Sequence, residues 1–180
     1  MTLPRSTLAA PAQLAQEVRK SRFLANATTV SAPDAAIAFV TSVAHADATH
    51  NCWAYRVGNH YRFNDDGEPA GTAGKPILQA IDGQGLDEIV VVVTRWFGGI
   101  KLGAGGLMRA YGGCAAECLR GAAKRELIRT SEVEFRVGFS ALPLLHARLA
   151  DFEAQKLSES FVSDGAVLRV RIATVRIDAL

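Results

Sequence analysis

Glycine is concentrated in one stretch of this chain, from Asp65 to Gly113. Of the 16 glycines, 12 lie there, on both sides of an apolar run that contains four consecutive valines, 90–93. Glycine adopts positive φ without steric cost and allows a second surface to approach the backbone closely. A run without alternation of apolar and polar residues is typical of a central strand covered on both faces. The stretch therefore predicts a buried strand between backbone-rich loops that form a shaped surface.

The residues around this strand predict a mixture of helices and strands. Strands are expected where β-branched and aromatic residues cluster or alternate, and helices where apolar residues recur every three to four positions. The turn at Gly58-Asn59 between two alternating runs is typical of a hairpin. In chain order, the expected elements are strand 21–30, a helix beginning at 31–34, hairpin strands 52–57 and 61–63, a short helix 76–81, strand 87–94 and a helix from 103 to about 126.

A second domain is expected after Leu127, where the composition changes. Its predicted elements are strand 132–139, helix 143–156 and strands 157–162 and 167–175. The order β-α-β-β is most of a ferredoxin-like α/β-plait without its last helix and strand. We therefore expect an α+β protein with an arm at 1–20, either loose or an edge segment, an N-terminal domain at 21–128 and an incomplete plait at 129–180.

Composition restricts the class of protein more than its function. A hydrophobic content of 49% with 21% charged residues is typical of a soluble globular protein. The three cysteines are odd in number and form no C-x-x-C pair, which disfavours a disulfide framework or a zinc site. No apolar run reaches the roughly 20 residues of a membrane helix, and the N-terminus lacks the apolar core of a signal peptide. We expect a cytoplasmic protein without a cofactor, and we leave its oligomeric state open.

Two nucleotide-binding motifs are nearly present but fail at defining positions. The run from Gly103 to Gly106 has Met108 where the third glycine of a dinucleotide fingerprint belongs. Lys75 follows a glycine as in a phosphate-binding loop, but Pro76 stands where a Ser or Thr would hold magnesium. The histidines are scattered, and no serine or cysteine has the context of a nucleophile. These observations favour a non-enzymatic role.

Three carboxylates precede the first glycine loop, Gly71–Gly74. Asp65, Asp66 and Glu68 lie within four residues and suit a hard cation, but they lack the spacing of a calcium loop. The run Asp-Asp-Gly-Glu-Pro is also favourable turn chemistry after a hairpin strand. We favour the turn and predict no metal.

Basic residues are concentrated beside the second glycine loop, Gly98–Gly106. Between positions 95 and 125, six basic residues are accompanied by the single acid Glu117, although the net charge of the chain is only +2. Guanidinium groups beside exposed backbone N–H groups suit phosphates or carboxylates, and a tryptophan at a loop tip is either core or a stacking platform. The simpler alternative is a solvated helix face. The predicted binding residues are Arg95, Trp96, Lys101 and Arg109, the backbone of Gly98, Gly99, Gly103, Gly105 and Gly106, and Lys75, Asp65, Asp66 and Glu68.

Four segments of the chain resemble the signature of the YigZ/IMPACT family. Residues 65–78 read DDGEPAGTAGKPIL and residues 93–111 read VTRWFGGIKLGAGGLMRAY. The segments SRFLA at 21–25 and HNCWAYR at 50–56 resemble the family's two earlier motifs. The resemblance covers residues 21 to about 126. It implies an N-terminal fold like that of ribosomal-protein domains and elongation factor G domain IV, and a C-terminal domain like another elongation-factor domain.

The resemblance also implies a role linked to translation, because eukaryotic relatives restrain a kinase that senses uncharged tRNA. In those relatives the activity depends partly on an additional N-terminal domain, which we do not expect in this protein. Our first hypothesis is therefore a binding module for RNA or a ribosome-associated partner, with no DNA-specific and no membrane signal. The alternatives are an enzyme that binds a small anionic substrate at the two glycine loops, with a carboxylate as acid, base or metal ligand, and a protein–protein adaptor in translational regulation.

Overall fold

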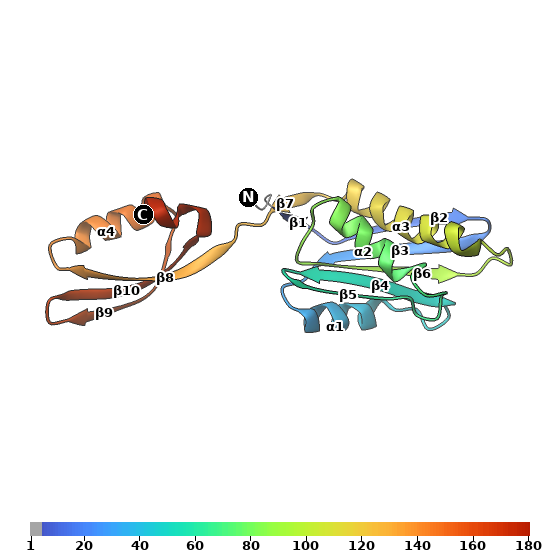
Figure 1. The fold of residues 1–180 in the computed structure, drawn as a ribbon, viewed down its shortest axis with the longest axis horizontal. Coiled ribbons are helices and arrows are strands. Elements are labelled where there is room, and N and C mark those ends of the chain that lie inside the picture. The colour runs from blue at the N-terminus through green and yellow to red at the C-terminus, as the bar shows by residue number, and fades with distance from the viewer. Residues whose placement is uncertain (1–4) are drawn as a thin grey trace. The chain divides into compact units, whose positions relative to one another are not determined.

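The computed structural model describes residues 5–180, which form two compact units, one ending at Leu127 and one running from Ile128 to Leu180. In the first unit, helices and strands alternate irregularly along the chain (Figure 1). Its elements are β1 (Ser6–Leu8), β2 (Ala12–Val18), β3 (Ser21–Thr29), α1 (Pro33–Val43), β4 (His50–Val57), β5 (His60–Asn64), α2 (Gly74–Gly83), β6 (Ile89–Trp96), α3 (Gly103–Gly121) and β7 (Lys124–Glu126).

An antiparallel sheet with the strand order β2-β3-β6-β4-β5 forms the frame of the first unit. The valine-rich strand β6 lies at its centre, as predicted, between β3 and β4. Successive side chains of a strand point to opposite faces of its sheet. Val91 and Val93 accordingly pack in one core cluster and Val90 and Val92 in another, so both faces of β6 are buried.

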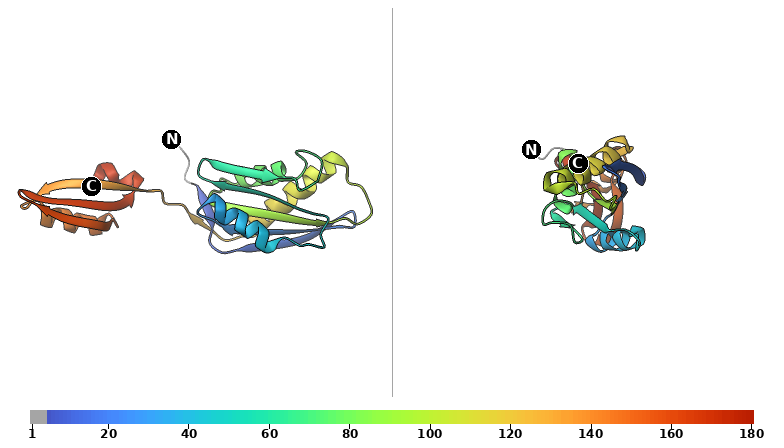
Figure 2. Two further views of the ribbon diagram at one scale, coloured as in Figure 1. Left: turned by 90° about the horizontal axis from the view of Figure 1, so that it is seen from below. Right: turned by 90° about the vertical axis from the view of Figure 1, so that its right-hand side faces the viewer.

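Helices cover both faces of this sheet. α2 and α3 lie on one face and α1 on the other, as the two views in Figures 1 and 2 show. In the helix that we predicted from residue 103, apolar residues recur at helical spacing, and Leu107, Tyr111, Cys114 and Cys118 are buried. Within residues 5–180, no helix is both long and apolar enough to cross a membrane.

The sequence prediction was wrong at the C-terminal end of α3. α3 stops at Gly121 instead of continuing to about residue 126, because 124–126 form β7 and pair with β1. Most of the expected arm is ordered, and Ala12–Val18 form an edge strand, β2, paired with β3. Residues 1–4 of that arm lie outside the described residues. The segment AQLAQEV alternates in burial, and this alternation is the feature that allows it to form a strand.

The second unit contains β8 (Thr130–Gly138), α4 (Leu142–Asp151), β9 (Gln155–Val162), β10 (Gly165–Ala173) and a final 3-10 turn η1 (Thr174–Ala179). The strands form an antiparallel sheet in the order β8-β10-β9, and α4 packs on it through Leu149 against Leu168 and Val170. α4 ends before the predicted residue 156, because β9 begins at Gln155. Both units thus combine helices with antiparallel sheets, which is consistent with the predicted α+β class.

Candidate functional site

The structure separates the predicted binding residues, and most of them lie in three places. Glu68 and Arg95 belong to a buried network inside the first unit. Trp96, Lys101 and the adjacent glycines lie at the surface near the β2–β3 turn, and Arg109 with Gly106 lines a groove between β2 and α3.

Glu68 is the centre of the buried network. Its Oε1 accepts hydrogen bonds from Arg95 Nη1 at 2.7 Å and from the Tyr111 hydroxyl at 2.6 Å. His50 Nε2 lies 3.7 Å from the other carboxylate oxygen. The Glu68 and Arg95 side chains are only 3% and 6% exposed, so water does not compensate either charge. The loop before α2, strands β4 and β6 and helix α3 are therefore joined at one carboxylate.

The surface position that we expected for Arg95 is wrong. Arg95 lies on the same face of β6 as Val91 and Val93, where alternation directs it toward α2 and α3. Its guanidinium carbon lies 5.8 Å from the centre of the Phe23 ring and 5.4 Å from that of Phe97. Among residues 5–180, its Nε has no hydrogen-bond partner. Arg95 is thus a buried, charged member of the core and is not available to an external ligand.

Asp65 occupies the N-terminus of α2 with its own carboxylate. Its two oxygens accept hydrogen bonds from the backbone amides of Gly71 at 2.8 Å, Ala73 at 3.1 Å and Gly74 at 2.8 Å. A carboxylate at this position satisfies amides that the helix leaves free and interacts favourably with the helix dipole. The first glycine loop was one half of the anion site in our enzyme hypothesis. In the structure, the Asp65 carboxylate already accepts hydrogen bonds from the amides of this loop, so they are not free for an external anion.

Asp66 is also engaged within the fold. Its Oδ2 accepts a hydrogen bond from the Asn51 amide at 2.6 Å, and its backbone oxygen lies 2.6 Å from His50 Nδ1. The run of acidic residues therefore fastens a turn to β4. Among the described residues, no group of three or more His, Cys, Asp or Glu side chains is arranged to hold a metal ion.

Burial shifts the pKa values of the three thiols and of the Tyr111 phenol. Burial raises the pKa of Cys52, whose Sγ donates to the Asp65 carbonyl at 3.0 Å, and burial together with the neighbouring Cys52 raises the pKa of Tyr111. Burial also raises the pKa of Cys114 to about 12 and raises that of Cys118. A nucleophilic cysteine needs its pKa lowered toward neutrality, so these neutral thiols are suited to the core and not to catalysis.

The second glycine loop packs against the turn between β2 and β3. A Cβ at Gly98 would lie 1.9 Å from the Lys20 carbonyl oxygen, so only glycine allows this approach. The Gly98 amide donates to Ser21 Oγ at 3.2 Å. Gly99 adopts a φ of +88° and Gly103 a φ of +73°, which bend the loop toward the start of α3. Distant parts of the sequence, 19–22 and 96–103, are thereby brought to one edge of the unit.

We define the loop surface as Lys20, Arg22, Trp96 and Lys101. Trp96 is half-buried on the face of β6 opposite to Arg95, and its Nε1 donates to Asp47 at 3.2 Å. The guanidinium carbon of Arg22 lies 4.2 Å from the centre of the Trp96 ring, within the range of a cation–π interaction. Lys20, Arg22 and Lys101 are exposed, and none of them has an ion-pair partner in the described part of the chain.

The remaining predicted residues lie at the starts of the two helices. Lys75 is exposed in the first turn of α2, and Gly105 is exposed in the first turn of α3. The N-cap residue of α3, Leu102, makes no capping hydrogen bond through its side chain. No described contact joins Lys75 to the loop surface. The loop that carries Lys101, by contrast, leads directly into α3.

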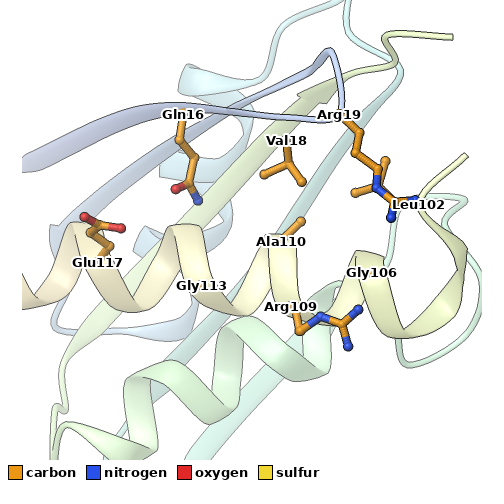
Figure 3. A pocket seen from close by; sticks show the side chains of 9 residues that line it. All are labelled: Gln16, Val18, Arg19, Leu102, Gly106, Arg109, Ala110, Gly113 and Glu117. Carbon is orange, nitrogen blue, oxygen red and sulfur yellow. The ribbon is translucent and has the colours of Figure 1, made fainter. Parts of the chain in front are cut away.

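A groove of about 350 Å³ runs between the edge strand β2 and helix α3 (Figure 3). From β2 and its turn, Gln16, Val18 and Arg19 point toward α3 in this view. The wall on α3 is made largely of small residues. We call this the β2–α3 groove, and its lining residues are Gln16, Val18, Arg19, Leu102, Gly106, Arg109, Ala110, Gly113 and Glu117.

The sequence prediction missed Arg19, Lys20 and Arg22. All three precede the glycine tract by more than 40 positions. Arg19 and Lys20 lie in the segment that we expected to be an arm, and Arg22 lies in the predicted strand 21–30. The motif SRFLA, which contains Arg22 and directly follows Lys20, was a signal that this segment belongs to the domain, but nothing in its sequence shows that it meets Gly98.

Comparison with known proteins agrees with this architecture. The model of the Impact N-terminal domain matches residues 19–119. The IMPACT family member in the pol 5′ region of Thermus thermophilus is 47% identical over 157 residues, covering 86% of each chain. The Escherichia coli (strain K12) IMPACT family member YigZ is 36% identical over 176 residues, covering 94% of this chain and 86% of YigZ. A crystal structure of a hypothetical protein superposes with a TM-score of 0.75 at 35% identity, covering 97% of this chain and 88% of the other. This chain belongs to the YigZ/IMPACT family.

Proposed function

We propose that the first unit is a translation-linked, non-enzymatic module that binds structured RNA through the loop surface. One observation carries the proposal. Lys20, Arg22 and Lys101 are exposed without ion-pair partners in the described chain, and the Gly98–Lys20 contact holds their segments together. Cations that are not neutralised by neighbouring acids remain available for phosphates.

The arrangement of the cations supports a nucleic-acid backbone as the ligand. Arg22 stacks on the Trp96 ring, and this interaction limits the freedom of its guanidinium before any ligand arrives. The close contact between the second glycine loop and the Lys20 backbone limits the movement of the turn that carries Lys20. Membership of the IMPACT family supports the link to translation, through eukaryotic relatives that restrain a kinase that senses uncharged tRNA.

A protein–protein adaptor is the second candidate function, and one observation favours it. Phe97 is 47% exposed and Ile100 is 41% exposed, and both lie in the loop that carries Lys101. Exposed aromatic and aliphatic side chains beside cations are typical of protein interfaces as well. The enzyme hypothesis has less support, because Asp65 fills the first glycine loop and no residue of 71–74 lines the β2–α3 groove.

Salt-dependent binding to a fluorescent RNA hairpin tests the proposal. For Lys20→Ala/Arg22→Ala/Lys101→Ala we expect weaker binding and a shallower dependence of log K on log salt, by about one for each lost phosphate contact. The matched control Arg62→Ala/Arg120→Ala/Arg125→Ala removes the same charge from exposed positions of the same unit. Equal losses for both variants, or none for either, would refute the loop surface as an RNA site. Retention of a protein partner that depends on Phe97 and Ile100, without RNA binding, would establish the adaptor.

A further inference from the structure

We propose that the β2–α3 groove binds an extended peptide that adds a strand to β2, with an acidic side chain at one end and a basic side chain at the other. This ligand and this surface differ from those of the proposed RNA site. The inference rests on an open strand edge, a groove beside it and the opposite charges at the two ends of that groove.

β2 offers the backbone groups that such a peptide needs. Within the described chain it pairs with β3 alone, and no other element bonds to the backbone of Ala12–Val18. An edge strand directs alternate N–H and C=O groups outward, where an extended segment can pair with them. A strand edge beside a helix is also the arrangement in which peptide-binding domains add a ligand strand.

The wall on α3 leaves room for the side chains of the added strand. Gly106, Ala110 and Gly113 follow the helical spacing that keeps residues on one face. A Cβ at Gly113 would meet no atom within 4 Å, so the wall is recessed at that point. Val18 and Ala110 provide the apolar contact at the middle of the groove, as Figure 3 shows for their side chains.

The charges specify the ends of the peptide. Arg19 and Arg109 are exposed cations without ion pairs in the described chain, and Glu117 lies eight residues beyond Arg109 on α3. At 1.5 Å per residue, Arg109 and Glu117 are about 12 Å apart along the helix. Five residues of an extended strand, from the first to the fifth, span about 13 Å and place positions one, three and five on one face.

These dimensions predict the order of the residues. Antiparallel pairing is slightly more stable than parallel pairing, so the N-terminal end of the peptide lies near Arg19. The preferred sequence is therefore acid-x-apolar-x-base, read from N to C, with the acid near Arg19 and Arg109 and the base near Glu117. The acid is an internal side chain and not the C-terminal carboxylate.

Fluorescence anisotropy with a labelled peptide, capped at both ends and containing Asp-Thr-Val-Thr-Lys, tests this assignment. The reversed peptide, Lys-Thr-Val-Thr-Asp, has the same composition and net charge, and we expect it to bind at least about tenfold more weakly. Arg109→Ala should weaken the forward peptide several-fold, and Gly113→Leu should abolish binding by filling the groove. Equal affinity for the two peptides, or no measurable binding of either, would overturn the proposal.

A charge exchange provides a control that loss of folding cannot imitate. Glu117→Lys should weaken Asp-Thr-Val-Thr-Lys about tenfold and strengthen Asp-Thr-Val-Thr-Glu by a similar factor. The RNA-site variant Lys20→Ala/Arg22→Ala/Lys101→Ala should bind the peptide normally, and Gly113→Leu should bind RNA normally. Failure of either proposal is thus separable from failure of the other. Competitive displacement of the peptide by RNA would show that the groove belongs to the RNA site, and would refute a separate peptide site.

Discussion

Neutralising Glu68 is the change that most directly tests the buried network. In Glu68→Gln, the amide oxygen can still accept the hydrogen bond from Tyr111, and the side chain keeps its volume. The negative charge beside Arg95 is lost. The Arg95 guanidinium remains positive, and its side chain is only 6% exposed to water. Its other contact is a 3.4 Å hydrogen bond to Ser21 Oγ, and its Nε is unpartnered within residues 5–180.

The expected loss follows from this environment. Removing one partner of a buried ion pair costs about 3–5 kcal/mol, because the remaining charge is neither paired nor hydrated. The lost charge-assisted hydrogen bond alone accounts for about 1.5–3 kcal/mol. We therefore expect Glu68→Gln to lower the free energy of unfolding of the first unit by about 3–5 kcal/mol. With an m-value of about 2 kcal/mol per molar, the urea midpoint falls by about 2 M.

Tryptophan fluorescence in urea measures this change selectively, since both tryptophans, Trp53 and Trp96, lie in the first unit. Asp82→Asn is the matched control. It breaks the Arg56–Asp82 pair, in which Asp82 is 42% exposed, and should cost less than about 1 kcal/mol. Glu68→Gln/Arg95→Met removes both charges and should recover much of the loss. A cost for Glu68→Gln no larger than that of the control would refute the reasoning.

Two further predictions concern packing and pH. Gly98→Ala should lower the free energy of unfolding by about 1–3 kcal/mol, because the added Cβ would overlap the Lys20 carbonyl. Gly113→Ala, whose Cβ meets no neighbouring atom, should raise it by about 0.5–1 kcal/mol. Both are measured by urea unfolding, and equal effects would contradict the close contact at Gly98. Burial raises the pKa of Cys114 from 9.0 to about 12. The thiol therefore ionises first in the unfolded chain, and its stabilising contribution is complete below pH 9 and is lost as pH rises toward 12. Between pH 9 and 10.5 this ionisation lowers the free energy of unfolding by about 2 kcal/mol. In Cys114→Ala the free energy of unfolding should therefore fall less steeply with pH. An unchanged slope would show that Cys114 does not cause the fall.

Periodic patterns predicted the frame of the protein well. The four consecutive valines predicted that both faces of β6 are buried, and helices cover both faces of the sheet. The stripe on α3 identified its buried face because helical spacing alone decides which residues share a side. The errors lie where pairing partners decide the structure. β1 and β7 are only three residues each, and their pairing joins segments more than 110 positions apart.

The candidate site was predicted less well, for a related reason. Arg95 and Trp96 are adjacent in sequence, so a linear interpretation placed them on one surface, whereas the strand directs them to opposite faces. Extending the alternation of β6 by two residues would have placed Arg95 inside. No local sequence pattern predicts the contact between Lys20 and Gly98. That contact depends on the β2–β3 turn and the second glycine loop, which are far apart in sequence, reaching the same edge of the unit.

The family signature therefore describes a frame more than a ligand site. Asp65 caps α2, Glu68 joins Arg95 to Tyr111, and Gly98 accommodates the backbone of Lys20. Each of these interactions is satisfied by another part of the same unit, so the residues have little capacity left for an external partner. The exposed side chains of Arg22, Lys101 and Arg109, which belong to the same signature segments, and of Glu117 keep that capacity. In both of our proposals, ligand binding depends on these exposed side chains.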